Sequence, residues 1–126
     1  MKLRQIIVVS LVLMAAPFIV FAAEPSDFEV KTTADILNLC TTPPDGNLYA
    51  EAINFCHGYL VGAYHYYLAS TTGPEGKQEF CFPEPRPTRD EAVGMFVVWA
   101  KDHPQYHNEL PVETEFRFLK ETWPCK

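Results

Sequence analysis

Apolar residues recur every three or four positions along most of the chain, which is the spacing of an α-helix. The longest such pattern runs from residue 47 to about residue 70. Its apolar positions are Ile53, Cys56, Leu60, Ala63 and Tyr67. Shorter patterns cover residues 32–40, 88–103 and 111–123, and no alternating strand pattern is present. The sequence therefore predicts an all-α domain of four helices, with the 47–70 helix at its centre because its apolar stripe is wide.

Turn and capping residues set the predicted boundaries of these helices. Thr32 or Thr33 caps the first helix, and Asn47 caps the second. Thr88 and Glu91 have the spacing of a capping box at the start of the third helix. Prolines follow the ends of the first, third and fourth patterns, where they prevent the helix from continuing.

The first 22 residues have the pattern of a secretory signal peptide. A short basic start precedes an apolar run over residues 6–21, and Ala22 supplies a small residue at the predicted cleavage site. A retained membrane anchor is the alternative, because the run is near the lower length limit for spanning a bilayer. Pro17 within the run favours cleavage. Residues 23–126 then form one domain.

Acidic residues dominate the charge of the predicted mature chain. Removing Lys2 and Arg4 leaves 8 basic and 16 acidic residues, a net charge of −8. Such a balance argues against binding to nucleic acid or to anionic membrane surfaces. It favours solubility and a basic protein partner.

The chain contains four cysteines, Cys40, Cys56, Cys81 and Cys125. An even number in an exported chain predicts two disulfides, and sequence alone leaves three pairings open. A zinc site is disfavoured because no C-x-x-C spacing is present. Cys81 lies in a stretch rich in proline and glycine, residues 70–86, that predicts a long loop.

Gly58 and Gly62 are four residues apart on one face of the central helix. Glycine in a helix interior costs roughly 1 kcal/mol relative to alanine, which suggests a packing reason for both. We predict that another backbone approaches this face closely, either within one chain or between two.

The polar residues of the chain do not form a recognisable catalytic or metal-binding motif. The histidines, which lack metal-ligand spacing, are His57, His65, His103 and His107. The acidic residues of the last helix are Glu113, Glu115 and Glu121, and we expect them to form a solvated face. No serine lies in a G-x-S-x-G turn. The sequence therefore predicts a protein that is not an enzyme and holds no metal or cofactor.

Tyrosine is unusually frequent for so small a domain. The six tyrosines are Tyr49, Tyr59, Tyr64, Tyr66, Tyr67 and Tyr106. Exposed tyrosines are common contact residues in protein interfaces. The alternative is that they are half-buried core residues whose hydroxyl groups reach water, and the sequence does not choose between the two.

Four short motifs occur in a characteristic order along residues 40–125. They are Phe55-Cys56-His57-Gly58-Tyr59-Leu60-Val61-Gly62, Cys81-Phe82-Pro83, Val97-Val98-Trp99 leading to His103-Pro104, and Trp123-Pro124-Cys125. This arrangement, behind a signal peptide, resembles the Rap/Tai-type immunity protein family. The segment 111–118 departs from the family pattern because it is bulkier and more charged, so the last helix and the connection before it are expected to serve a different partner.

The resemblance implies a small periplasmic helical protein that forms a homodimer. Such proteins bind peptidoglycan amidase effectors delivered by type VI secretion and occlude their active sites. We expect contacts with such a partner from Tyr106 and His107, which precede the last helix, and from Glu75 and Lys77 in the long loop.

Two other functional classes are consistent with the sequence. One is a small periplasmic chaperone or acid-stress protein, which would expose apolar surface at low pH. The other is a secreted structural or host-facing binding factor. For the disulfides we predict the nested pairing, Cys56 with Cys81 and Cys40 with Cys125.

Overall fold

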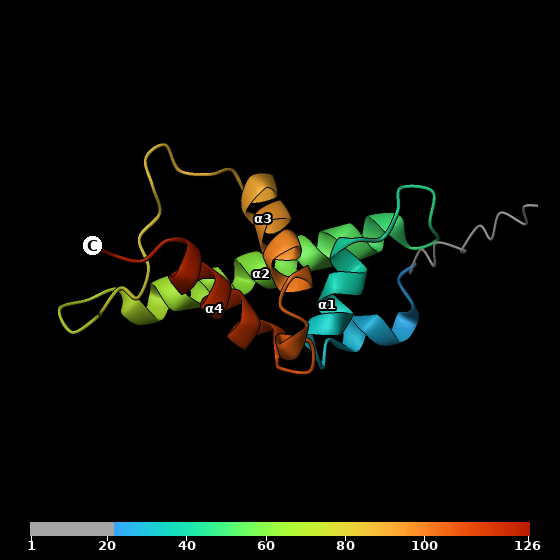
Figure 1. Cartoon of the computed structure of the whole chain (residues 1–126), viewed down its shortest axis with the longest axis horizontal. Coiled ribbons are helices and arrows are strands. Elements are labelled where there is room, and N and C mark those ends of the chain that lie inside the picture. Colours follow the sequence, from blue (N-terminus) through green and yellow to red (C-terminus); the bar gives the residue numbers. More distant parts are fainter. Residues whose placement is uncertain (1–21) are drawn as a thin grey trace, which may run out of the picture.

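A computed structural model describes residues 22–126 of the chain, which form four α-helices and two short 3-10 helices. The elements in order are η1 (Pro25–Glu29), α1 (Thr33–Cys40), α2 (Tyr49–Thr71), α3 (Arg89–Lys101), η2 (Pro104–Tyr106) and α4 (Pro111–Thr122). Helix α2 runs along the long axis of the domain, and the other three α-helices lie against it (Figure 1). The described part of the chain contains no strand, so the predicted all-α fold of four helices is confirmed.

Local capping explains where most of these helices begin. Thr32 caps α1 and Thr88 caps α3, and each forms a capping box with an acidic residue three positions later. Pro111 occupies the first turn of α4, where its missing N–H group is not needed. The prediction that Asn47 caps α2 is wrong. The N-cap is Leu48, in a left-handed conformation with φ of 65° and no side-chain cap hydrogen bond.

The core forms where α1, α3 and α4 meet the middle of α2. Its fully or nearly fully buried apolar residues include Ile36, Leu39, Ala52, Leu60, Phe96, Ala100 and Phe118. A buried polar contact joins α1 to α4, because the hydroxyls of Thr33 and Thr114 lie 2.7 Å apart. This pairing satisfies both hydroxyls, which would otherwise be costly to bury.

All four cysteines form disulfides, but the predicted nested pairing is wrong. Cys40 is bonded to Cys56, and Cys81 is bonded to Cys125. The turn after α1 folds α2 back across α1, so Cys40 meets the second turn of α2. The Cys81 N–H donates a hydrogen bond to the carbonyl oxygen of Trp123 at 2.8 Å, which places Cys81 beside the C-terminus. Proximity along the chain therefore decides the first pair, which is 16 residues apart, whereas the second pair spans 44 residues and depends on how the long loop folds back onto the C-terminus.

The glycine pair of α2 lies on an exposed face. A Cβ atom added to Gly58 or Gly62 would meet no atom of the described chain within 4 Å. The prediction that another backbone of the same chain packs closely at these positions is therefore wrong. Packing of this face between two chains stays a prediction.

The long loop between α2 and α3 is held to the domain by aromatic side chains. Phe80 is buried and stacks on Tyr67, with ring centroids 4.8 Å apart. Phe82 packs against Trp123 at the same distance. The Tyr67 hydroxyl also accepts a hydrogen bond from the Glu79 N–H at 2.7 Å. The second half of this loop is thus part of the packed domain.

The predicted signal peptide, residues 1–22, lies almost wholly outside the described residues. Among residues 22–126, no helix combines the length and apolar character needed to cross a membrane.

Removing the disulfide between Cys81 and Cys125 should destabilise the domain more than removing the other. It closes a separation of 44 residues, against 16 for the pair of Cys40 and Cys56. Chain-entropy arguments give losses of about 4 and about 3 kcal/mol in the free energy of unfolding. Urea unfolding of the C81A/C125A and C40A/C56A variants measures both. Mass mapping of unreduced peptides checks the pairing, and peptides linking Cys56 to Cys81 would contradict it.

Candidate functional site

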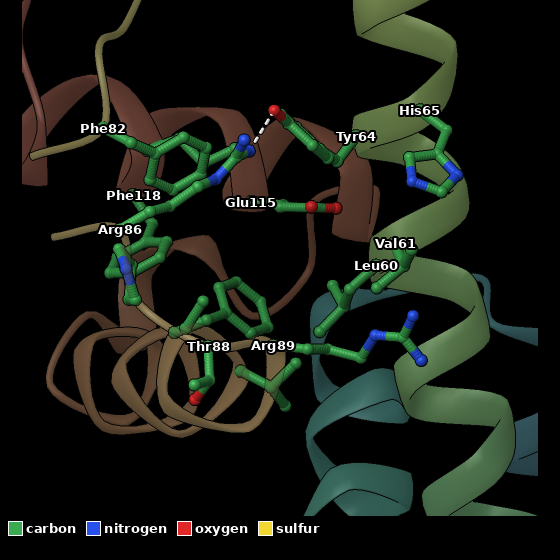
Figure 2. Close-up of a pocket in the computed structure, with 15 residues that line it drawn as sticks. Leu60, Val61, Tyr64, His65, Phe82, Arg86, Thr88, Arg89, Glu115 and Phe118 are labelled. Atoms are coloured by element: carbon green, nitrogen blue, oxygen red, sulfur yellow. Dashed lines mark hydrogen bonds between the residues drawn. The ribbon is translucent and has the colours of Figure 1, made fainter. Parts of the chain in front are cut away.

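A cavity of about 220 Å³ lies where α2, α3, α4 and the end of the long loop meet. Its apolar lining includes Leu60, Tyr64, Phe82, Phe96, Phe118 and Leu119. Figure 2 shows the cavity between α2 on one side and the loop and α4 on the other. The cavity is partly open to solvent, and Arg86, Thr88 and Arg89, which line it where the loop enters α3, are exposed. A small molecule or a side chain could therefore reach it.

Glu115 is the one carboxyl group that lines this cavity. It projects from α4 across the cavity towards α2 (Figure 2), and only 5% of the residue is exposed. Its Oε2 atom has no hydrogen-bond partner among the described residues. Burial raises the pKa of the Glu115 carboxyl to about 9. At neutral pH the group is therefore a neutral acid that can both donate and accept a hydrogen bond.

The expectation that Glu115 lies on a solvated face is wrong, although Glu113 and Glu121 are exposed as predicted. The buried residues of α4 are Pro111, Thr114, Glu115, Phe118 and Leu119. This spacing places Glu115 in the middle of the inward face of the helix. The apolar positions on both sides of it in the sequence are the signal that could have identified it.

Two arginines lie at the edge of the cavity, on exposed parts of the chain. Arg86 donates a hydrogen bond to the Tyr64 hydroxyl, and its guanidinium carbon lies 4.3 Å from the centre of the Phe82 ring. Arg89, the first residue of α3, extends towards α2 (Figure 2). Within residues 22–126, neither arginine has a carboxylate oxygen within 4 Å of its guanidinium nitrogens. The rim of the cavity is therefore locally cationic in a chain that is acidic overall.

The predicted partner-binding residues do not line this cavity, and they fall in two separate segments. Tyr106 is half-buried and stacks on Trp99, with ring centroids 5.9 Å apart. The His107 Nε2 atom lies 2.9 Å from the carbonyl oxygen of Ala100. Both side chains thus help to hold the connection between α3 and α4 in place.

The other two predicted contact residues, Glu75 and Lys77, are exposed in the long loop that follows α2. The tip of this loop extends beyond the C-terminal end of α2, whereas the connection before α4 lies nearer the middle of the domain (Figure 1). The structure therefore does not bring the two predicted pairs together in one site. Partner binding by either pair stays a prediction.

The tyrosines divide between the two interpretations of their frequency. Tyr66 is 77% exposed and Tyr67 is 8% exposed, which are the extremes of the set. Tyr59, Tyr64 and Tyr106 are half-buried. Within residues 22–126, no group of three or more potential ligand residues is arranged to hold a metal ion.

The fold and the cavity define a small, acidic helical domain held together by two disulfides. The sequence model of the Rap1a immunity proteins matches residues 32–125, so the chain belongs to this family. The resemblance noted from the sequence motifs is confirmed. Membership indicates immunity against a secreted effector, in a family whose members are generally not enzymes. The chain matches no curated protein and no solved structure.

Burial of Glu115 should make the domain less stable as the pH rises. The pKa of this carboxyl is about 9 in the folded state against an ordinary value of 4.5, so the folded state binds the extra proton between these values. The contribution of protonated Glu115 to the free energy of unfolding is fully present below pH 4.5. It is lost progressively up to about pH 9, by as much as about 1.4 kcal/mol per pH unit.

Comparison with the variant Glu115→Gln isolates this effect, because the amide has a similar shape and does not titrate. The difference in unfolding free energy, variant minus wild type, should rise steadily between pH 5 and pH 8.5. Glu113→Gln is the matched control, because Glu113 is exposed on the same helix. A difference curve for Glu115→Gln as flat as that of the control would show that the buried carboxyl does not have the raised pKa.

Proposed function

We propose that this protein is a periplasmic immunity protein that binds a peptidoglycan amidase effector delivered by type VI secretion and occludes its active site. The observation that carries the proposal is the match of the Rap1a immunity proteins to residues 32–125, which covers all four α-helices. The protein acts by binding and carries out no chemistry of its own.

Compartment and charge support this proposal. Two disulfides suit an oxidising environment such as the periplasm, where the effector would act. The net charge of −8 predicted for the mature chain favours association with a basic partner surface, mainly by raising the rate of encounter.

The tip of the long loop is the segment that we expect to enter the effector cleft. Every residue from 72 to 79 is exposed, and Glu75 and Lys77 lie in this run. An exposed, protruding loop is shaped to plug a concave active site. Tyr106 and His107 lie in the second expected contact region, but their side chains also support the fold, so substitutions there affect stability as well as binding.

A homodimer is the assembly that we propose, with the exposed face around Gly58 and Gly62 as the contact between two α2 helices. Glycines allow two helices to approach closely, and this face is open in the single chain. Light scattering of the wild type and of a Gly62→Leu variant tests the assembly, because a bulky side chain at this contact should leave a monomer.

Inhibition of an amidase is the direct test of the proposed function. Purified protein beginning at Ala23 should inhibit one peptidoglycan amidase from the parent organism at near-equal amounts. The double charge reversal E75K/K77E should weaken inhibition about tenfold or more, as expected for residues at the centre of an interface.

The matched control is Asp45→Lys, an exposed charge change in the turn at the opposite end of α2. Equal inhibition by E75K/K77E and the control would move the contact surface away from this loop. Absence of binding to any amidase of the organism would reject the amidase as target.

A further inference from the structure

The cavity that contains Glu115 has the size and lining of a small-molecule site. Its volume of about 220 Å³ exceeds the roughly 150 Å³ of an engineered protein cavity that binds benzene. Aromatic rings from four different segments form much of its wall, namely Tyr64, Phe82, Phe96 and Phe118. Such walls favour a flat ring that packs against them edge-on or offset.

Glu115 supplies an unsatisfied polar group at the inner side of this cavity. Buried polar atoms are nearly always hydrogen-bonded, and one left unpaired destabilises the protein. Only 5% of Glu115 is exposed, and its Oε2 atom has no hydrogen-bond partner among the described residues. Because a neutral carboxyl both donates and accepts, a hydroxyl group of a ligand would satisfy it in either direction.

Arg89 supplies an unpaired cation at the rim. In Figure 2 its side chain and that of Glu115 both extend towards α2, with Leu60 between them. Arg86 is already engaged by the Tyr64 hydroxyl and the Phe82 ring, so Arg89 is the guanidinium available to an anion. Two acidic residues follow Arg89 in α3. Asp90 lies 3.6 Å from the Nδ1 atom of His57, and Glu91 accepts hydrogen bonds from Thr88.

We propose that this cavity is a binding site for a small aromatic carboxylate that also carries a hydroxyl group. The ring lies against Leu60 and the aromatic wall, the hydroxyl pairs with Glu115, and the carboxylate pairs with Arg89. This site is separate from the loop tip proposed to contact the effector, so it stands or falls independently of the immunity function.

Binding of 4-hydroxyphenylacetate to the mature protein, measured by calorimetry and by thermal shift, tests the proposal. We expect saturable binding that raises the melting temperature with ligand concentration. Phenylacetate, which lacks the hydroxyl, and 4-hydroxyphenylethanol, which lacks the carboxylate, should each bind about tenfold more weakly.

Substitutions at Arg89 and Glu115 assign the polar contacts. Arg89→Gln should weaken 4-hydroxyphenylacetate about tenfold while leaving 4-hydroxyphenylethanol unchanged. Glu115→Leu should make 4-hydroxyphenylacetate and phenylacetate bind equally, and Glu115→Gln should retain part of the preference. Lys101→Gln, which removes one exposed positive charge from the same helix as Arg89, is the control and should bind as the wild type does.

Two results would overturn the proposal. One is the absence of saturable binding of 4-hydroxyphenylacetate at millimolar concentration by the folded wild type. The other is equal binding by the wild type, Arg89→Gln and Glu115→Leu, which would place the ligand elsewhere on the protein.

Discussion

The covalent link between Cys81 and Cys125 is the constraint on which the rest of this structure depends. The segment between α2 and α3 has no regular secondary structure, and regular backbone hydrogen bonds do not hold it. The disulfide and the hydrogen bond from the Cys81 N–H to Trp123 fix its middle to the C-terminus. Phe80 and Phe82, which flank Cys81 in the sequence, pack against each other and against Tyr67 and Trp123 respectively. Arg86 reaches the edge of the cavity. The cavity wall is thus a consequence of the crosslink.

A buried carboxyl is an unusual feature of a domain with so small a core. A domain of this size has only a narrow margin of stability, and an apolar residue at position 115 would fill the space without an unpaired oxygen. Groups that are costly to bury and lie in a cavity are candidates for a functional role rather than a structural one. The cationic rim around Glu115 strengthens this argument, because two arginines without a carboxylate partner at the edge of the cavity are not needed to stabilise an apolar core.

Helix positions were predictable from the sequence because their determinants are local. Apolar spacing, the capping boxes at Thr32 and Thr88, and Pro111 all act within one turn of the helix they define. The disulfide pairing was not predictable, because it depends on how the turn after Cys40 and the long loop travel through space. Glu115 falls between these cases. Its position between Pro111, Thr114 and Phe118 marked the buried face, but a glutamate in a charged segment favours the solvated interpretation on composition alone.

The cavity and the proposed effector contact share one segment of chain, residues 72–88. Its first half is exposed and carries Glu75 and Lys77, whereas its second half contributes Phe82 and Arg86 to the cavity. If both proposals hold, a ligand that orders the second half reduces the entropy that the first half loses on binding an effector. Linkage then requires the reverse effect of equal size, so the effector would also strengthen ligand binding. The disulfide at Cys81 sits between the two halves and limits this coupling, because it already restrains the chain where they meet.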